Sequence, residues 1–336
     1  MVTRLSVPVS GTSESGPYLE KNETQVSLSY RYLHAERHFK DNNVEVIPPG
    51  PHVELNTIDL SFTYQVSLRD ALSLSIPYIR GTFNRGFALA GPGERSISRS
   101  SGIGDVALTY RRWILDPATH VGGNYRLAFG LKFPTGDYDQ RNDRPVNIGT
   151  RDEPIVATMS SNADVAIQPG DSGFGLIFGF DGFKPVQEHL VLYADATYLA
   201  NPREKNDMNN QEFGPGPYVP NDHSSVPDYY LARAGGAFPR PFGLNNVATS
   251  LGLRIEGQPV HDVIGHSGGF RRPGYTLAIE PGLNFERWAS LFSLSVPVTI
   301  KRVRYNSVDE DLDGRTSAVS AAFADYNILA GYSMRF

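Results

Sequence analysis

Apolar and polar residues alternate with a period of two along most of the chain. In the segment YRLAFGLKF (125–133), every odd-numbered residue is aromatic or leucine, and the residues between are arginine, alanine, glycine and lysine. The segments VSLSYRY (26–32) and TIDLSFTYQV (57–66) repeat this pattern. A period of two is typical of a β-strand with two different faces and not of an amphipathic helix. The sequence therefore predicts an all-β protein.

We expect about twelve such strands, each with an apolar and a polar face. All of them are long enough to cross a bilayer as a tilted strand, which takes roughly 9–11 residues. The expected strands cover residues 22–38, 52–67, 72–86, 104–115, 122–136, 172–184, 188–201, 228–238, 246–260, 274–286, 289–304 and 323–336.

The connections between these strands are alternately short and long. Short ones such as LRDA (68–71) and PVQE (185–188) alternate with long ones rich in Gly, Pro, Asn and Asp, of which 137–171 is the longest. This rhythm is typical of bacterial outer-membrane barrels. We therefore predict a transmembrane antiparallel up-and-down β-barrel over 22–336, with short periplasmic turns and long extracellular loops, preceded by an N-terminal periplasmic segment over 1–21. A soluble β-sandwich or jelly roll is the alternative, because its strands alternate as well.

Composition narrows the function classes. The chain has no cysteine, which excludes disulfides, thiolate metal sites and a cysteine nucleophile. The net charge is -5 with both signs spread along the chain, which argues against a nucleic-acid surface. The longest uncharged stretch, 288–300, is shorter than the roughly 20 residues of a membrane-spanning helix. The start MVTRLSVPVS lacks the apolar core of a secretory signal, so either a signal peptide has been removed or the chain is never exported. An outer-membrane location requires the first, and that is our expectation.

The chain ends on an alternating segment, NILAGYSMRF (327–336), whose apolar positions run to the last residue. Chain termini usually fray. A barrel in lipid instead pairs its last strand with its first, because lipid leaves no unpaired backbone edge. We therefore expect this segment to pair with the strand at 22–38 and to turn its apolar face toward lipid.

Four segments together resemble one bacterial outer-membrane family. They are SGIGDVALTYRR (101–112), AFGLKFPTGDYD (128–139), IQPGDSGFG (167–175) and LVLYADATYLAN (190–201), and they are similar to the family named for the meta-pathway of phenol degradation. The resemblance covers about 101–201. It implies a β-barrel transporter or channel for aromatic or other small hydrophobic compounds.

The ending AGYSMRF resembles the C-terminal recognition signal of outer-membrane barrels. That signal combines a terminal aromatic residue with apolar residues at alternate positions before it. The resemblance implies that Tyr332, Met334 and Phe336 are read by the barrel-assembly machinery.

The polar strand faces would line the lumen if the apolar faces meet lipid. Charges of both signs occur there, and we expect them to pair across strands, because unpaired charge in a narrow lumen is costly. About eight strands leave a filled interior and 16–18 an open channel, so twelve predict a narrow or partly plugged passage. Either 1–21 or 137–171 is the expected plug. The candidate pore-lining residues are Arg31, Asp59, Asp105, Arg111, Arg126, Lys132, Asp181, Asp195, Arg254, Glu256, Glu280, Glu286 and Lys301.

Prolines interrupt several expected strands, at Pro77, Pro134, Pro281 and Pro297. Proline cannot donate to the strand ladder. We expect β-bulges at these positions, and a lateral opening toward lipid is the alternative.

An acidic segment, DEDLDG (309–314), places Asp309, Asp311 and Asp313 before a glycine, as in the first half of a calcium loop. The twelfth position holds Ser320 in place of a carboxylate. The segment is therefore either a solvated acidic turn or a weak calcium-binding site. No other cofactor is expected.

Histidines offer an enzymatic alternative. His261 and His266 lie in HDVIGHSGG, and His223 precedes two serines. A Ser–His pair on a barrel would suit a lipid hydrolase. The extended motif of outer-membrane phospholipases is absent, and these histidines fall in expected loops. His34 and His38 are too far apart along one strand to share a metal.

The function predicted from the sequence is passive uptake of small, hydrophobic or aromatic compounds by a monomeric outer-membrane channel without catalytic residues. A barrel lipid hydrolase and a sealed structural or adhesive barrel are the alternatives.

Overall fold

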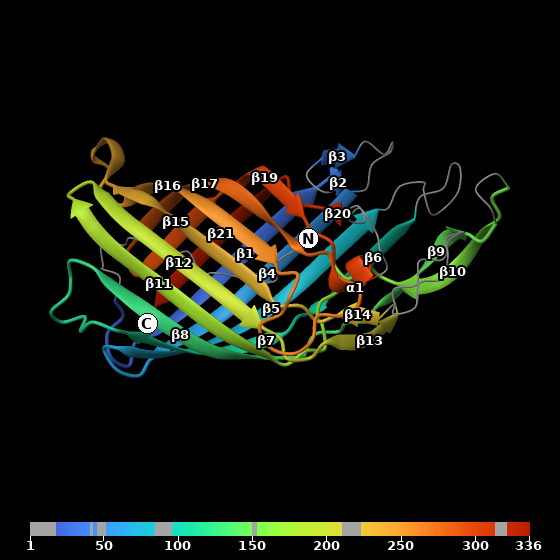
Figure 1. Cartoon of the computed structure of the whole chain (residues 1–336). Coiled ribbons are helices and arrows are strands. Elements are labelled where there is room, and N and C mark those ends of the chain that lie inside the picture. The colour runs from blue at the N-terminus through green and yellow to red at the C-terminus, as the bar shows by residue number, and fades with distance from the viewer. Residues whose placement is uncertain are drawn as a thin grey trace.

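Twelve strands close into one antiparallel barrel (Figure 1), as the alternation predicts. The computed structural model describes residues 18–40, 43–45, 52–84, 96–149, 153–209, 223–312 and 321–336. Within these residues, none of the helices could cross a bilayer. Ten barrel strands are continuous: β1 (Thr24–Ala35), β4 (His52–Gln65), β5 (Asp70–Asn84), β8 (Asn124–Phe133), β11 (Gly175–Gln187), β12 (Leu190–Ala200), β15 (Tyr229–Pro239), β16 (Val247–Gln258), β17 (Gly274–Arg287) and β21 (Tyr326–Arg335).

The other two barrel strands are each interrupted. One consists of β6 (Ile97–Ile103) and β7 (Val106–Trp113), and the other of β18 (Ser290–Ser295) and β19 (Val298–Arg304). The expected strand at 104–115 therefore extends further toward the N-terminus, over the polar segment that forms β6. Alternation is hard to recognise there because serine and arginine occupy most positions.

The barrel closes between its first and last strands. β1 pairs with β4 on one side and with β21 on the other, in a register that runs from Gln25 opposite Arg335 to His34 opposite Tyr326. Thr24 and Phe336 exchange two backbone hydrogen bonds, of 2.9 and 3.1 Å. The predicted pairing of the C-terminal segment with the first strand is confirmed.

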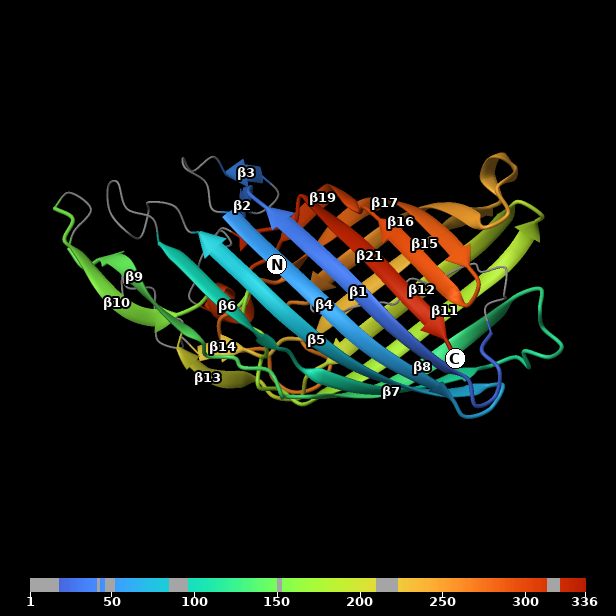
Figure 2. The same cartoon turned by 180° about the vertical axis from the view of Figure 1, so that it is seen from behind.

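The two ends of the barrel differ, as Figures 1 and 2 show. Short turns and the C-terminus lie at one end, here called the short-turn end, and the extended connections project from the other, the long-loop end. The turn between β15 and β16 contains the short helix η1 (Pro241–Gly243). The predicted alternation of short and long connections is thus present.

The long connections carry their own secondary structure. β2 (His38–Lys40), β3 (Asn43–Glu45) and β20 (Ala321–Ala322) form a small sheet, β9 (Arg141–Asn147) pairs with β10 (Val156–Asn162), and β13 (Lys205–Asn209) pairs with β14 (His223–Ser225). Helix α1 spans Val308–Leu312. The sequence pattern gave no sign of these short elements.

The outer wall of the barrel is apolar. Large side chains that face outward are about half exposed, among them Leu127 and Phe129 at 49% and Leu251 at 54%. Their neighbours in the strand face inward and are often buried polar residues, such as Arg254 at 4%. An apolar exterior with a polar interior is the inverse of a soluble domain and fits a barrel surrounded by lipid.

Prolines lie at both strand interruptions. Along β5, Tyr78 pairs with Ile103 and Ser75 pairs with Ala107, so residues 104–106 lie opposite only Ile76 and Pro77. Three residues face two, and this interruption is therefore a β-bulge. Pro297 lies between β18 and β19, opposite a part of β17 that includes Pro281. In both places the missing proline N–H coincides with a break in the ladder.

Candidate functional site

A network of charged side chains crosses the barrel interior. Arg31, on β1, forms an ion pair of 2.9 Å with Glu256, on β16. These strands are separated in the wall by β17, β18 and β21, so the contact spans the lumen. We call this network the charged belt, and its members are Arg31, Asp195, Arg233, Arg254, Glu256 and Glu280.

The remaining contacts of the charged belt lie within β16 or connect strands of the stretch from β12 to β17. Arg254 lies 3.0 Å from Glu256 and 3.5 Å from Glu280. Arg233 lies 3.4 Å from Glu280 and 2.5 Å from Asp195. All six side chains are at most 10% exposed. Three guanidinium groups face three carboxylates, so the formal charges of the belt cancel.

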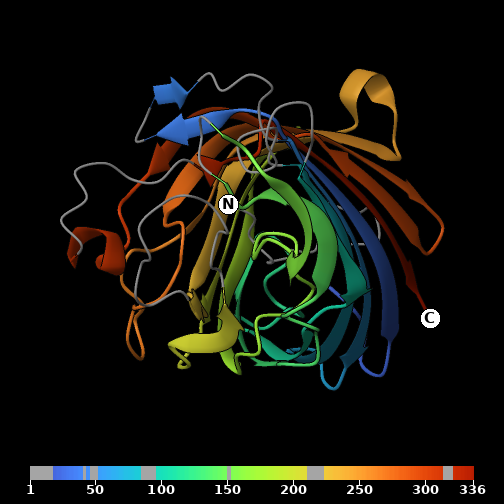
Figure 3. The same cartoon turned by 90° about the vertical axis from the view of Figure 1, so that its right-hand side faces the viewer.

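A second feature of the interior is an inward segment, residues 163–171, which follows β10 and lies within the ring of strands (Figure 3). Ile167 is fully buried. It lies so close to Gly81 of β5 that a Cβ atom added to this glycine would be 2.5 Å from the Ile167 Cβ. Ala163 and Ile167 pack against inward-facing apolar residues of β1, β4 and β5. These residues are Leu33, Ala35, Val53, Leu55, Ile79 and Phe83.

Lys132 ties the inward segment to the barrel wall. Its ammonium lies 2.5 Å from Asp171, in the inward segment, and 3.5 Å from Asp105, at the bulge between β6 and β7. Gly136 and Gly170 touch through their backbones nearby, and a Cβ on Gly136 would lie 2.8 Å from the Gly170 nitrogen. Three of the four segments that carry the family resemblance meet at this point.

The opposite side of the lumen holds the inward segment as well. Arg272, just before β17, forms an ion pair of 2.8 Å with Asp164, although 108 residues separate them. The Ser100 hydroxyl donates a hydrogen bond to the Ile167 carbonyl from the β6 side. The inward segment therefore bridges two walls of the barrel.

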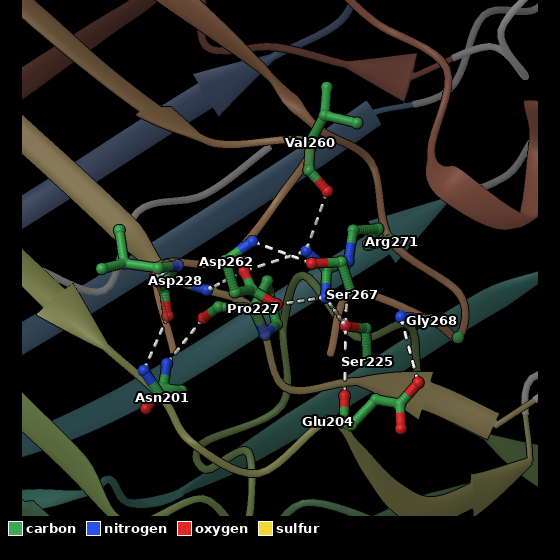
Figure 4. A network of polar contacts seen from close by, with 12 residues as sticks. Asn201, Glu204, Ser225, Pro227, Asp228, Val260, Asp262, Ser267, Gly268 and Arg271 are labelled. Carbon is green, nitrogen blue, oxygen red and sulfur yellow. Dashed lines mark hydrogen bonds and ion pairs between the residues drawn. The ribbon is translucent and has the colours of Figure 1, made fainter. Parts of the chain in front are cut away.

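A polar network lies under the loops of the long-loop end (Figure 4). Arg271 and Asp262 form a fully buried ion pair of 2.6 Å, and Arg271 also donates to the Ser225 hydroxyl. Asp228 accepts hydrogen bonds from the backbone nitrogens of Asn201 and Val263, at 2.7 and 2.8 Å. Burial raises the pKa of Asp228. These bonds join the ends of β12, β15 and β16 to the loops above them.

A cavity of about 50 Å³ lies between the inward segment, the β13–β14 hairpin and the barrel wall. Tyr138, Tyr229, Phe270 and Met208 supply its apolar surface. The polar lining includes Gln168, Asp171, Asn206, Ser224, Ser225, Gln258, Arg271 and Arg272. The cavity therefore has a mixed lining, in which aromatic rings lie beside a larger number of polar side chains.

The short-turn end of the lumen has a different environment. Arg126 forms an ion pair of 3.0 Å with Asp181 and lies 4.8 Å over the Trp113 ring. Arg111 is on the same inner face, and its Nε has no hydrogen-bond partner in the part of the chain that the structure describes. Tyr18 packs edge-on against Trp113 at 5.1 Å.

Residues 18–21 are the described part of the predicted N-terminal segment 1–21, and the rest of it lies outside the described residues. The Tyr18 hydroxyl donates to the His120 carbonyl at 2.6 Å, and Arg335 donates to the Tyr18 carbonyl at 3.4 Å. This segment therefore links the β7–β8 turn to the last strand at the short-turn end. Its role as a plug stays a prediction.

The structure places most of the candidate pore-lining residues inside the barrel. Asp59 is 4% exposed and accepts hydrogen bonds from Ser61 and Ser75. Whether these side chains line a conducting path stays a prediction. The inner-face residues are Arg31, Asp59, Arg111, Arg126, Lys132, Asp181, Asp195, Arg254, Glu256, Glu280 and Glu286, with Asp105 at the bulge.

Lys301 differs from this set and does not face the interior. A register irregularity next to Ala278 places Lys301 opposite Leu277, on the outer face, and its side chain is exposed. A bulge shifts every later residue to the other face, which alternation counted from the strand start cannot show. Arg302 faces inward in its place and pairs with Asp325 at 2.8 Å.

Asp309 and Asp311 lie in helix α1, and Asp313 lies outside the described residues. Asp309 accepts a hydrogen bond from the Gly269 nitrogen at 2.8 Å, and Asp311 accepts one from Asn306 at 2.7 Å. The calcium site stays a prediction. His223, the first residue of β14, is exposed, and His261 and His266 are exposed loop residues.

Sequence reasoning did not select Arg233, Asp164, Asp171 or the Arg271–Asp262 pair. Arg233 could have been found, because it is the one charged residue of β15. The others lie in connections, where periodicity carries no signal.

Comparisons with known proteins support the fold. No protein-family model matches the chain, and no curated protein matches it. Among solved structures, the COG4313 outer membrane channel from Pseudomonas putida F1 is similar, with a TM-score of 0.61 and 13% identity over 98% of this chain and 100% of that one. The P. putida toluene transporter TodX gives a TM-score of 0.44 and 11% identity over 95% and 91%.

Identities this low show the fold alone. The expected antiparallel β-barrel fold is confirmed at that level. The chain has the fold of a bacterial outer-membrane β-barrel channel.

Proposed function

We propose that the protein is a monomeric outer-membrane channel for passive uptake of small hydrophobic, including aromatic, compounds. The observation that carries this proposal is the cavity beside the inward segment, where the rings of Tyr138, Tyr229 and Phe270 lie beside polar side chains. Flat aromatic walls favour aromatic ligands through ring–ring contacts. Tyr229 of β15 and Gln258 of β16 line the cavity, so a ligand bound there lies inside the barrel, against its inner surface.

The charged belt favours the passage of neutral solutes over that of ions. Its three positive and three negative groups are paired, so it offers no net attraction to an anion or a cation. A small uncharged molecule passes such a belt without displacing an ion pair, provided that space exists beside it. The inward segment narrows the route and would set an upper limit on solute size.

Transport is tested with the full chain in lipid. In planar bilayers we expect small single-channel currents. In Gram-negative cells with an intact lipopolysaccharide layer we expect faster uptake of radiolabelled toluene when the chain is present, and little change for benzoate, which has a similar ring and a charge. Absence of both current and added uptake would overturn the channel and favour a sealed structural or adhesive barrel.

The outer-membrane location is tested by fractionation. We expect the chain in the outer-membrane fraction, running as a monomer in detergent. A soluble, monodisperse chain without detergent would contradict it. Release of fatty acid from phospholipid micelles, lost in His266→Ala, would instead indicate the lipid hydrolase.

A further inference from the structure

Two histidines and a glutamate come together on the outer face of the barrel at the long-loop end. The ligand atoms of His34, Glu36 and His52 all lie within 4.8 Å of one another. His34 lies near the end of β1, and His52 starts β4, the strand paired with it. Sixteen residues of connection and turn separate Ala35 from His52, so only strand pairing creates this group.

Neighbouring side chains orient both imidazoles. Glu54 lies opposite His34 in the β1–β4 register, and its Oε1 is 3.1 Å from His52 Nε2. The Tyr32 hydroxyl lies 3.4 Å from His34 Nδ1 and donates to Glu54 at 3.2 Å. The His34 ring also stacks on Tyr326 of β21, with centroids 5.2 Å apart. Metal-binding histidines usually have such outer partners, which fix the ring and its tautomer.

The donor set suits a transition-metal ion better than a hard cation. Two imidazole nitrogens and one carboxylate are ligands of Zn²⁺, and a fourth position can be taken by water. Mg²⁺ and Ca²⁺ prefer oxygen ligands. Zn²⁺ bonds of about 2.0–2.1 Å bring tetrahedral ligands to roughly 3.4 Å from each other. His34 Nε2 and Glu36 Oε1 are already 3.6 Å apart, and small side-chain rotations would complete the closure.

We propose that His34, Glu36 and His52 bind a divalent transition-metal ion, with Zn²⁺ as the representative. The ion reaches the site from outside, because the Glu36 side chain is 62% exposed and that of His52 is 35% exposed. Once bound, it links the end of β1 to the start of β4 beside the β1–β21 seam. The proposal is independent of what the barrel transports.

The test is titration of the detergent-purified full chain, prepared without a polyhistidine tag, with ZnCl₂ and separately with MgCl₂ in a calorimeter. We expect one saturable Zn²⁺ site per chain, a higher unfolding temperature with Zn²⁺, and neither effect with Mg²⁺. His34→Gln and His52→Gln should each weaken Zn²⁺ binding at least about tenfold. Circular dichroism of each variant verifies that the barrel is folded.

His189→Gln is the matched control, because His189 is exposed in the β11–β12 turn at the short-turn end. It should bind Zn²⁺ as the unaltered chain does. Tyr32→Phe removes one outer hydrogen bond and should weaken binding less than loss of either histidine. Absence of saturable Zn²⁺ binding, or equal binding by a folded His34→Gln/His52→Gln double variant, would overturn the proposal.

Discussion

At the residue scale, the interior of this barrel depends on charges that balance one another. Arg31 and Glu256 have side chains 10% and 7% exposed, and each is close to a group of opposite sign. Removing one member of a buried pair leaves the other without compensation, which typically costs about 3–5 kcal/mol. These side chains therefore restrict the lumen and stabilise the barrel together.

Arg31→Ala should widen the lumen and make it more negative. The truncation removes the side chain that crosses to Glu256 and leaves three carboxylates with two guanidinium groups. We expect a larger single-channel current, a reversal potential shifted toward cation selectivity, and a loss of stability of about 3–5 kcal/mol.

Lys301→Ala is the matched control for that measurement. It also removes one positive charge, but from the outer face. Its current and selectivity should match those of the unaltered chain. Equal currents for Arg31→Ala and the unaltered chain would show that the belt does not restrict conduction.

Gly170→Ala tests a close backbone contact of the interior. A Cβ at this position collides with the Gly136 carbonyl, because the two chain segments touch without side chains between them. Overpacking of this kind should destabilise the barrel by about 1–3 kcal/mol. Thermal unfolding measures it, and Gly122→Ala, where nothing lies within 4 Å, should change little.

At the element scale, the inward segment converts an open barrel into a narrow one. It packs Ile167 against β1, β4 and β5 and reaches Arg272 on the other side. Twelve strands enclose more space than side chains alone fill. A connection that folds inward fills this space and still leaves room for a small cavity.

Lys132→Met should loosen the inward segment. The substitution leaves the Asp105 and Asp171 carboxylates, 6% and 7% exposed, without their shared ammonium. We expect a stability loss of about 3–5 kcal/mol and larger, noisier currents. Lys184→Met is the control, because Lys184 is exposed on β11. Unchanged stability and current in Lys132→Met would contradict the anchoring role.

At the scale of the whole molecule, the barrel closes through backbone hydrogen bonds that include the last residue. The hydrogen bonds between Thr24 and Phe336 belong to the main chain, and the Phe336 side chain is 67% exposed. Because the ring makes few contacts within the barrel, we propose that its role is recognition by the barrel-assembly machinery.

Phe336→Ala should separate folding from assembly. In detergent the variant should refold to the same barrel with an unfolding temperature close to that of the unaltered chain, because the seam is intact. In cells its amount in the outer membrane should fall several-fold. Normal amounts in cells would contradict a role of the terminal aromatic residue in recognition by the barrel-assembly machinery.

The sequence alone determined the barrel, since alternation fixes which residues face lipid and the final apolar segment requires a partner strand. Most of the interior charges followed from the same alternation. The bulge that turns Lys301 outward, the ion pair between Arg31 and Glu256, the inward segment and the His34–Glu36–His52 group were decided only by tertiary structure. The physical reason is that alternation is a local property of one strand, whereas these contacts depend on register, curvature and loop paths that bring distant residues together.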